Sequence, residues 1–205
     1  MDNIFINKQS SIKITGSKVL YFDPWDMPFE GDADIIFITH DHFDHFSPVD
    51  IELLSKSDTV VVCPQKMARK VNAKNVLAAE PGINYNVKGI DFTAVAAYNI
   101  KKHFHPKSDG WCGYRVNLDG ISYYITGDTD ATDEVTSTKC DMLLLPIGGT
   151  YTMDIKQAAE CAAKAAPKTV IPTHYGAVVG KPSDGKKFCE VMQKLAPNVN
   201  VQLKL

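Results

Sequence analysis

The chain has 205 residues, 44% of them apolar, and a formal net charge of −2 from 22 basic and 24 acidic residues. This length and apolar fraction suit a single domain over residues 1–205, and the balanced charge without a basic block argues against binding of duplex nucleic acid. No run reaches the roughly 18 apolar residues of a membrane helix, and residues 1–14 lack the order of a secretory signal, so we expect a cytoplasmic protein without a membrane partner. Its five scattered cysteines are typical of reduced thiols, and the sequence does not define the oligomeric state.

The first half of the chain alternates short apolar runs with turn residues. Ser47 and Pro48 supply an N-cap and a first helical residue, which predicts a helix to about Lys56. A short helix is expected over residues 65–71. The predicted strands of this half are 4–7, 12–15, 19–22, 35–39 and 60–63.

The second half begins with antiparallel signals and ends with strands that alternate with helices. Turns are expected at 87–90 and at 117–121, where Asp119-Gly120 separates two alternating runs. The predicted strands are 92–97, 123–126, 142–145, 170–173 and 199–203, and the predicted helices are 154–165 and 184–195. Strands followed by helices in both halves predict an α/β fold, a four-layer αββα sandwich of two mixed sheets face to face with helices outside.

The densest chemical signal is the run from Thr39 to His45. It holds three of the six histidines and the carboxylate of Asp44, and it follows the apolar run 35–38. Imidazole nitrogens and carboxylate oxygens are ligands that zinc and similar divalent ions prefer, and a loop after a strand can place several of them around one cavity. The run therefore predicts a metal site.

Further metal-type residues follow three other predicted strands, at His105, Asp128 and His174. Functional groups gather on loops at the edge of a rigid sheet, so this recurrence supports the metal hypothesis. The candidate ligands are seven in all: His40, His42, Asp44, His45, His105, Asp128 and His174. Seven are too many for one tetrahedral ion but suit two ions that share a carboxylate and a water.

The segment 40–45 reads His-Asp-His-Phe-Asp-His and matches the signature His-x-His-x-Asp-His of the metallo-β-lactamase superfamily, which the chain resembles over most of its length. The motifs at 98–99, 104–107, 127–130, 146–153 and 172–176 are similar to those of small single-domain metal-dependent hydrolases related to the ascorbate-6-phosphate lactonase branch. The resemblance implies that His40, His42 and His105 hold one ion, that Asp44, His45 and His174 hold the other, and that Asp128 bridges them.

Two divalent ions would deprotonate a bridging water, and the resulting hydroxide would attack the substrate. Asp44 and Asp128 are the predicted catalytic residues, because Asp44 would orient this hydroxide and Asp128 would fix the distance between the ions. Zinc is the expected metal, with Mn²⁺ or Fe²⁺ as alternatives, since His42 stands where the di-iron branch has a carboxylate. Asp128 stands where several antibiotic-cleaving members have a cysteine, so cleavage of β-lactams is not expected.

Several neighbouring residues have two readings. His105 is preferred over His103 as a ligand because it carries the family's His-Pro-Lys context. Asp130 either stabilises a turn or orients a ligand, and Thr129 and Thr173 are either ligand-orienting or ordinary strand-end residues. The segment 148–151 either lines the substrate pocket through its backbone N–H groups and the Tyr151 hydroxyl or forms a simple turn.

Three functions remain open from the sequence. The first is hydrolysis of a small ester or lactone, with an anionic substrate held by Lys107 or a loop amide. The second is hydrolysis of a cyclic or short single-stranded nucleotide, because the same two ions stabilise phosphoryl transfer. The third, from another class, is a metal-stabilised binding protein without turnover.

Overall fold

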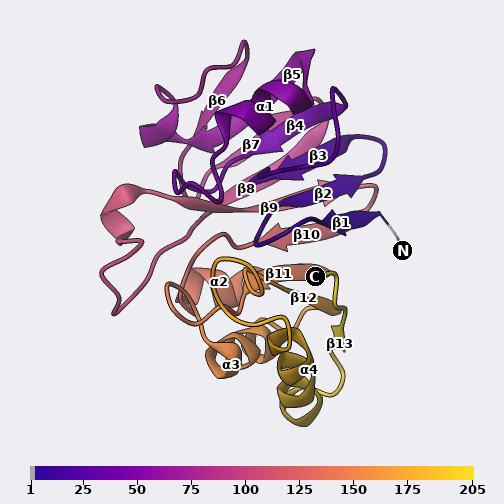
Figure 1. The fold of residues 1–205 in the computed structure, drawn as a ribbon, viewed down its shortest axis with the longest axis vertical. Coiled ribbons are helices and arrows are strands. Elements are labelled where there is room, and N and C mark those ends of the chain that lie inside the picture. Colours follow the sequence, from indigo (N-terminus) through magenta and orange to yellow (C-terminus); the bar gives the residue numbers. More distant parts are fainter. Residues whose placement is uncertain (1–2) are drawn as a thin grey trace.

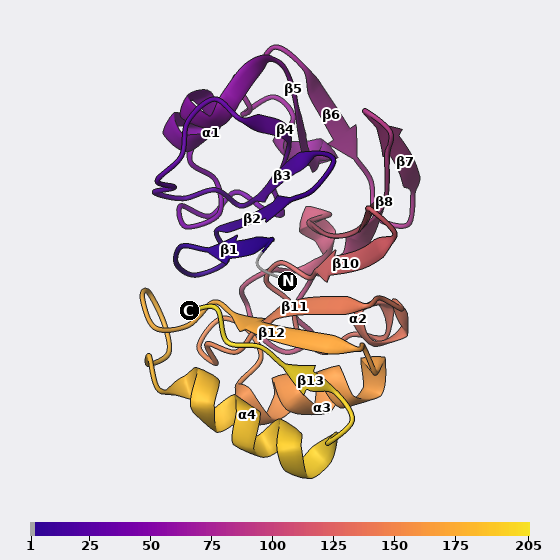
Figure 2. The same ribbon diagram turned by 90° about the vertical axis from the view of Figure 1, so that its right-hand side faces the viewer.

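Two β-sheets pack face to face in the computed structural model of the protein, which describes residues 3–205. The first sheet runs in the order β1-β2-β3-β4-β5-β6 and the second in the order β13-β12-β11-β10-β9-β8-β7. Helices cover the outer faces of both sheets (Figure 1, Figure 2). The predicted αββα sandwich is confirmed.

The first sheet begins as an antiparallel meander and continues as a parallel sheet from β3 onward. Parallel neighbours end at the same edge, so the loops that follow β3 and β4 lie side by side. Its strands are β1 (Ile4–Ile6), β2 (Ile12–Thr15), β3 (Val19–Phe22), β4 (Ala33–Phe37), β5 (Ser55–Pro64) and β6 (Val76–Ala79).

The second sheet has the same division, with antiparallel pairs from β7 to β10 and parallel pairs from β10 to β13. The segments after β10, β11 and β12 therefore also leave the sheet at one edge. Its strands are β7 (Asn84–Val87), β8 (Ile90–Ala96), β9 (Cys112–Leu118), β10 (Ile121–Ile125), β11 (Met142–Pro146), β12 (Thr169–Thr173) and β13 (Asn200–Val201).

A buried aromatic cluster joins the two sheets. Phe37 of β4 stacks on Phe22 of β3 with ring centroids 4.8 Å apart, and it meets Phe92 of β8 at 5.1 Å and Tyr114 of β9 at 5.0 Å. All four rings are nearly inaccessible to solvent. Burial of such large apolar surfaces is the main force that holds the two sheets together.

Each helix packs apolar residues against one of the two sheets. Helix α1 (Pro48–Leu54) packs on the first sheet, while α2 (Asp133–Ser137), α3 (Ile155–Ala165) and α4 (Asp184–Leu195) pack on the second. Ser47 caps α1, and Asp154 and Gln157 form a capping box at the start of α3. No helix among residues 3–205 combines the length and apolar character needed to cross a membrane.

Some predicted element bounds were wrong. Helix α1 ends at Leu54 because the chain continues directly as β5 from Ser55, and the helix expected over 65–71 is only the 3₁₀ turn Gln65–Met67. The last strand covers two residues of the predicted five. No strand bounds were predicted for β6, β7 or β9, and no helix was predicted for α2. β6, β7 and α2 are short and lie at a sheet edge or beside a larger helix, where tertiary contacts outweigh local preference.

Candidate metal centre

The histidine-rich loop is fixed at both of its ends. It follows β4, and it turns tightly because the backbone N–H groups of His45 and Phe46 both donate to the carbonyl of His42, at 3.0 and 2.9 Å. It then runs into α1, whose N-cap Ser47 accepts a hydrogen bond from the backbone of Asp50. This turn buries His45 completely and leaves His42 partly exposed.

The other three candidate ligands come from the second sheet. Asp128 follows β10 after Gly127, His174 directly follows β12, and His105 ends the loop that follows β8. His105 and His174 both adopt a left-handed backbone with φ of 57°, which turns each side chain sharply out of the course of its loop. All three side chains are buried.

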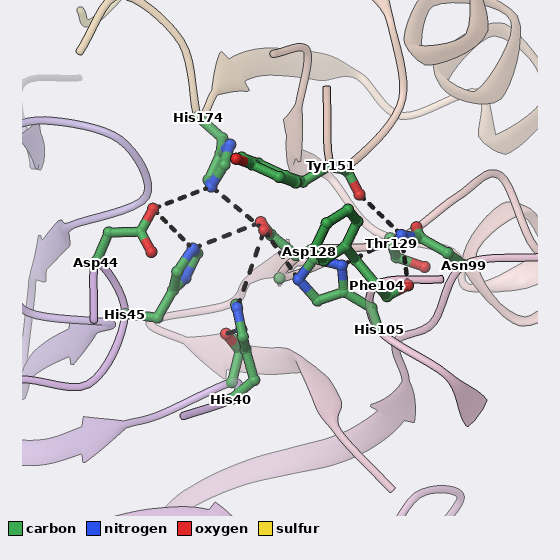
Figure 3. Close-up of polar contacts among 12 residues, drawn as sticks. His40, Asp44, His45, Asn99, Phe104, His105, Asp128, Thr129, Tyr151 and His174 are labelled. Carbon is green, nitrogen blue, oxygen red and sulfur yellow. Dashed lines mark hydrogen bonds and ion pairs between the residues drawn. The ribbon is translucent and has the colours of Figure 1, made fainter. Parts of the chain in front are cut away.

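Asp128 lies at the centre of the site, as Figure 3 shows. Its carboxylate oxygens lie 3.3 Å from Nε2 of His105, 3.3 Å from Nε2 of His174, 3.6 Å from Nε2 of His45 and 3.9 Å from Nε2 of His40. These four histidines come from loops of both sheets. The carboxylate therefore occupies the position that a bridging ligand would take.

The remaining donor atoms form two clusters on either side of Asp128. In each cluster the donor atoms lie within 4.8 Å of one another, and the clusters are His40, His42 and His105, and Asp44, His45 and His174. In the second, Asp44 Oδ2 lies 3.4 Å from His174 Nε2 and 3.7 Å from His45 Nε2. The structure thus groups the seven residues in the way that the resemblance implied, and their binding of metal stays a prediction.

The donor atoms themselves fit divalent ions. Nitrogens held 2.0–2.1 Å from one tetrahedral ion lie about 3.3 Å apart, close to the N–O separations around Asp128. Buried polar atoms normally have hydrogen-bond partners, and those without one call for an explanation. The buried site atoms without a partner include Nε2 of His40, His45, His105 and His174, and Oδ1 of Asp128. Cations between them would satisfy all of these atoms.

The electrostatics favour a cation at the same place. Burial would raise the pKa of Asp128, but the imidazoles of His174 and His45 hold it well below its ordinary value. Burial would lower the pKa of His45, but the carboxylates of Asp128 and Asp23 outweigh it and raise the pKa to about 9. Burial, reinforced by His45, lowers the pKa of His40 well below its ordinary value. The carboxylates therefore draw positive charge into the site, while the imidazole of His40 stays neutral and able to bind metal.

Asp23, which was not among the predicted site residues, holds the histidine loop through hydrogen bonds. Its carboxylate is fully buried and lies 2.7 Å from Nδ1 of His45. It also accepts hydrogen bonds from the backbone N–H and the hydroxyl of Thr39, and that hydroxyl lies 2.9 Å from Nδ1 of His40. Asp23 is within 4.8 Å of donor atoms of His40 and His45, but these hydrogen bonds make it an orienting residue. Its sequence signal is a carboxylate directly after the buried strand β3.

Gln9 and Asn99 contact candidate ligands without belonging to either donor cluster. The Gln9 side chain lies 3.5 Å from Asp44 Oδ2, and its backbone carbonyl accepts from the N–H of His174 at 2.9 Å. The Asn99 amide donates to the carbonyls of Phe104 and Tyr151, and it lies 3.2 Å from Nδ1 of His105. Gln9 lies in the turn between β1 and β2, which carries no sequence signal of such a role.

A cavity of about 420 Å³ opens over the candidate metal centre. Phe43, Phe104, Tyr151 and Val178 form its walls, and Asp44, Asp128 and His174 lie at its base. Figure 3 shows the Tyr151 side chain reaching toward His174.

Glycines 148 and 149 do not line this cavity. The Gly149 N–H donates to the carbonyl of Met153, and a Cβ at Gly148 would lie 2.4 Å from the carbonyl oxygen of His174. The missing side chain at Gly148 thus lets two loops approach closely, and of residues 148–151 only Tyr151 lines the cavity.

The structure decides two of the assignments that the sequence left open, those of His103 and Asp130. His103 is exposed and belongs to neither donor cluster. Asp130 fastens the loop that leads to His105, because its carboxylate accepts from the backbone N–H of Ile100 at 2.9 Å and from the Lys102 ammonium at 2.7 Å.

The structure places Lys107, one of the two groups expected to hold an anionic substrate, outside the cavity. The Lys107 ammonium bonds to the Glu134 carboxylate at 2.9 Å and to the Tyr98 hydroxyl at 3.3 Å, and it does not line the cavity. The Glu134 carboxylate thus holds the Lys107 ammonium outside the cavity.

Comparisons with known proteins agree with this geometry. Residues 7–174 match the β-lactamase superfamily domain. The chain belongs to the metallo-β-lactamase superfamily. It is 30% identical to a UPF0173 metal-dependent hydrolase of Thermococcus onnurineus, covering 87% of this chain and 88% of that protein, and 35% identical to another from Koribacter versatilis, covering 78% and 74%. This superfamily member is therefore a metal-dependent hydrolase.

Solved structures of the superfamily show the same architecture. A metal-dependent hydrolase from Parabacteroides distasonis superimposes with a TM-score of 0.83 at 31% identity, over 98% of this chain and 92% of that one. The metallo hydrolase Igni18 from Ignicoccus hospitalis has the same fold, with a TM-score of 0.75 at 21% identity over 98% and 93% of the two chains.

Proposed function

We propose that this hydrolase uses two divalent metal ions, most favourably Zn²⁺, to cleave a small ester or lactone within one domain spanning residues 1–205. The observation that carries the proposal is the buried Asp128 carboxylate, which lies 3.3–3.9 Å from four histidine nitrogens that have no hydrogen-bond partner. One ion would be held by His40, His42 and His105, the other by Asp44, His45 and His174, with Asp128 shared between them. The imidazole-rich donor set favours zinc, with Mn²⁺ or Fe²⁺ as alternatives.

Bound ions would supply a deprotonated water near neutral pH and would polarise the attacked carbonyl. The protein side chains position the reactants. Asp44 lies at the base of the cavity, where its carboxylate can accept a hydrogen bond from the attacking water and aim its lone pair. Asp23 and Thr39 hold the rings of His45 and His40 in fixed orientations.

Tyr151 is the polar group on the substrate side of the cavity. Its side chain reaches toward His174 and lines the cavity, and its backbone carbonyl is fixed by Asn99 at 2.7 Å. We assign its hydroxyl to donation of a hydrogen bond to the substrate oxygen on which negative charge develops. The segment 148–151 then contributes a side-chain donor in place of the backbone donors expected from the sequence.

Protein stripped of metal by a chelator tests the mechanism on a panel of esters, lactones and bis-(p-nitrophenyl) phosphate. We expect the stripped protein to lose ester or lactone cleavage and Zn²⁺ to restore it. Full activity after stripping would refute the metal-dependent mechanism. Turnover of the phosphodiester alone would assign the site to phosphodiesters, and full metal loading without turnover of any compound would support a binding protein.

A further inference from the structure

The walls of the cavity are unusually apolar for side chains in contact with solvent. Phe43, Phe104 and Val178 are 66%, 49% and 41% exposed, and all three line the same cavity. Single exposed apolar residues are common, but a group of them around a concave site beside polar reactive groups is typical of a surface that binds an apolar ligand.

Both phenylalanine rings are held in place by other aromatic rings. Phe43 contacts Trp25 edge to face, with centroids 5.8 Å apart and an interplanar angle of 88°. Phe104 contacts Tyr151 in the same manner at 4.8 Å and 81°. Such pairs fix the ring orientations before a ligand binds, which lowers the entropy cost of binding.

The cavity offers no positive side chain to an anionic substrate. Within residues 3–205, neither lysine nor arginine lines it. The ammonium of Lys70 is paired with Asp41 at the cavity mouth, and that of Lys107 is paired with Glu134 outside it. Beyond the metals, a negatively charged substrate group would face the Lys70–Asp41 ion pair, whose ammonium already has a carboxylate partner, and the apolar walls, where an unpaired charge is costly to desolvate.

We propose that the substrate is a neutral ester or lactone whose acyl or alkyl group is apolar and packs between Phe43, Phe104 and Val178. This inference rests on the proposed function, because it describes the part of the substrate that extends away from the reacting carbonyl. It replaces the expectation of an anionic substrate.

A matched pair of metal-binding ligands tests the character of the cavity without relying on turnover. Hexanohydroxamic acid and adipic monohydroxamic acid share a hydroxamate and a six-carbon chain, but the second ends in a carboxylate. Calorimetric titration of the zinc-loaded full chain should give at least tenfold tighter binding of hexanohydroxamic acid. Equal affinities, tighter binding of the carboxylated compound, or no binding of either would overturn the inference.

Substitutions at the walls locate the preference. Phe104→Lys, or Phe43→Lys on the other wall, should reduce the preference for hexanohydroxamic acid to about twofold or reverse it. Ile83→Lys is the control, because Ile83 is 48% exposed and lies outside the cavity. The Ile83→Lys control should keep the full preference. Affinities are compared only for variants whose circular dichroism and zinc content match those of the parent protein. Unchanged preferences in both wall variants would contradict the inference.

A parallel kinetic comparison separates this inference from the proposed function. p-Nitrophenyl butyrate and mono-p-nitrophenyl succinate share a leaving group and a four-carbon acyl chain, and kcat/KM should favour the neutral butyrate at least tenfold. Tight binding of hexanohydroxamic acid without turnover of either ester would refute ester cleavage and leave the apolar cavity standing. Turnover of both esters at similar rates, with equal hydroxamate affinities, would refute the apolar preference and leave the reaction standing.

Discussion

Two buried aspartates of the site differ in what their oxygens contact. Both oxygens of Asp23 are hydrogen-bonded, to Thr39 and to Nδ1 of His45, whereas Oδ1 of Asp128 has no hydrogen-bond partner. A carboxylate whose oxygens are already bonded can orient a neighbour, while one with a free oxygen can bind a cation. This distinction supports the proposed metal-bridging role of Asp128 and an orienting role of Asp23 toward His45.

Asp128→Ala should lower the metal content from two ions per chain to one or fewer and reduce kcat/KM at least 100-fold, because it removes the shared carboxylate. His103→Ala is the control, since His103 is exposed and outside both donor clusters. Inductively coupled plasma mass spectrometry counts the metal. Full metal content in the Asp128 variant, or a large loss in the His103 variant, would contradict the assignment.

Asp23→Ala should weaken metal binding about 10- to 100-fold, because His45 and Thr39 lose the group that orients them. Competition with a chromogenic chelator measures the affinity. Asp26→Ala is the control, because its carboxylate is exposed and pairs with Lys8 at the surface. An affinity for metal that is the same in both variants would show that Asp23 has no orienting role.

At the scale of elements, parallel strand pairing brings the site together. β3 and β4 end at one edge of the first sheet, and β10 and β12 belong to the parallel part of the second. Residues directly after these strands are therefore neighbours despite their separation in sequence. The loop that follows β8 is longer than these connections, and it is fastened through Asp130.

Asp130→Ala should loosen this loop and selectively weaken the metal position that includes His105. Amide hydrogen exchange over residues 99–105 should accelerate at least tenfold, because the bonds to Ile100 and Lys102 are lost. Asp133→Ala is the matched control, since its carboxylate is almost fully exposed and pairs weakly with Lys164. Unchanged exchange in the Asp130 variant would show that the loop is held by other contacts.

Local sequence patterns identify the strongly apolar strands and the capped helices but not the short edge strands. Strong apolar runs such as 142–145 and capped helices such as α3 are recognisable, because pattern and capping residues agree. The short edge strands β6 and β7 are not, because their pairing partners and the packing around them decide their conformation.

At the scale of the whole molecule, the proposed metals lie where the two sheets meet. The loop of residues 39–45 belongs to the first sheet, and His105, Asp128 and His174 belong to the second. Ions bound by both groups would link the sheets at this edge, in addition to the aromatic core around Phe37. Metal binding should therefore contribute to global stability.

Removal of metal should lower the melting temperature. Ions that bind only the folded state at 100 times their Kd stabilise it by about 2.7 kcal/mol per site, which corresponds to roughly 5–10 °C for a chain of this size. Differential scanning calorimetry before and after chelation measures the shift, and added Zn²⁺ should reverse it. His40→Ala should show a smaller shift. Identical melting temperatures with and without metal would argue against ions shared by the two sheets.

The sequence alone determined the superfamily, the sandwich fold and the seven candidate ligands, because the signature 40–45 and the strand-end residues are local patterns with a direct chemical meaning. The tertiary structure decided which groups support them. Asp23, Gln9 and Trp111 reach the candidate ligands only through folding, and Trp111 lies within 5.3 Å of three histidine rings. The tertiary structure also pairs Lys107 with Glu134 and places apolar walls over the candidate metal centre. Such contacts depend on distances between segments remote in sequence, which no local pattern encodes.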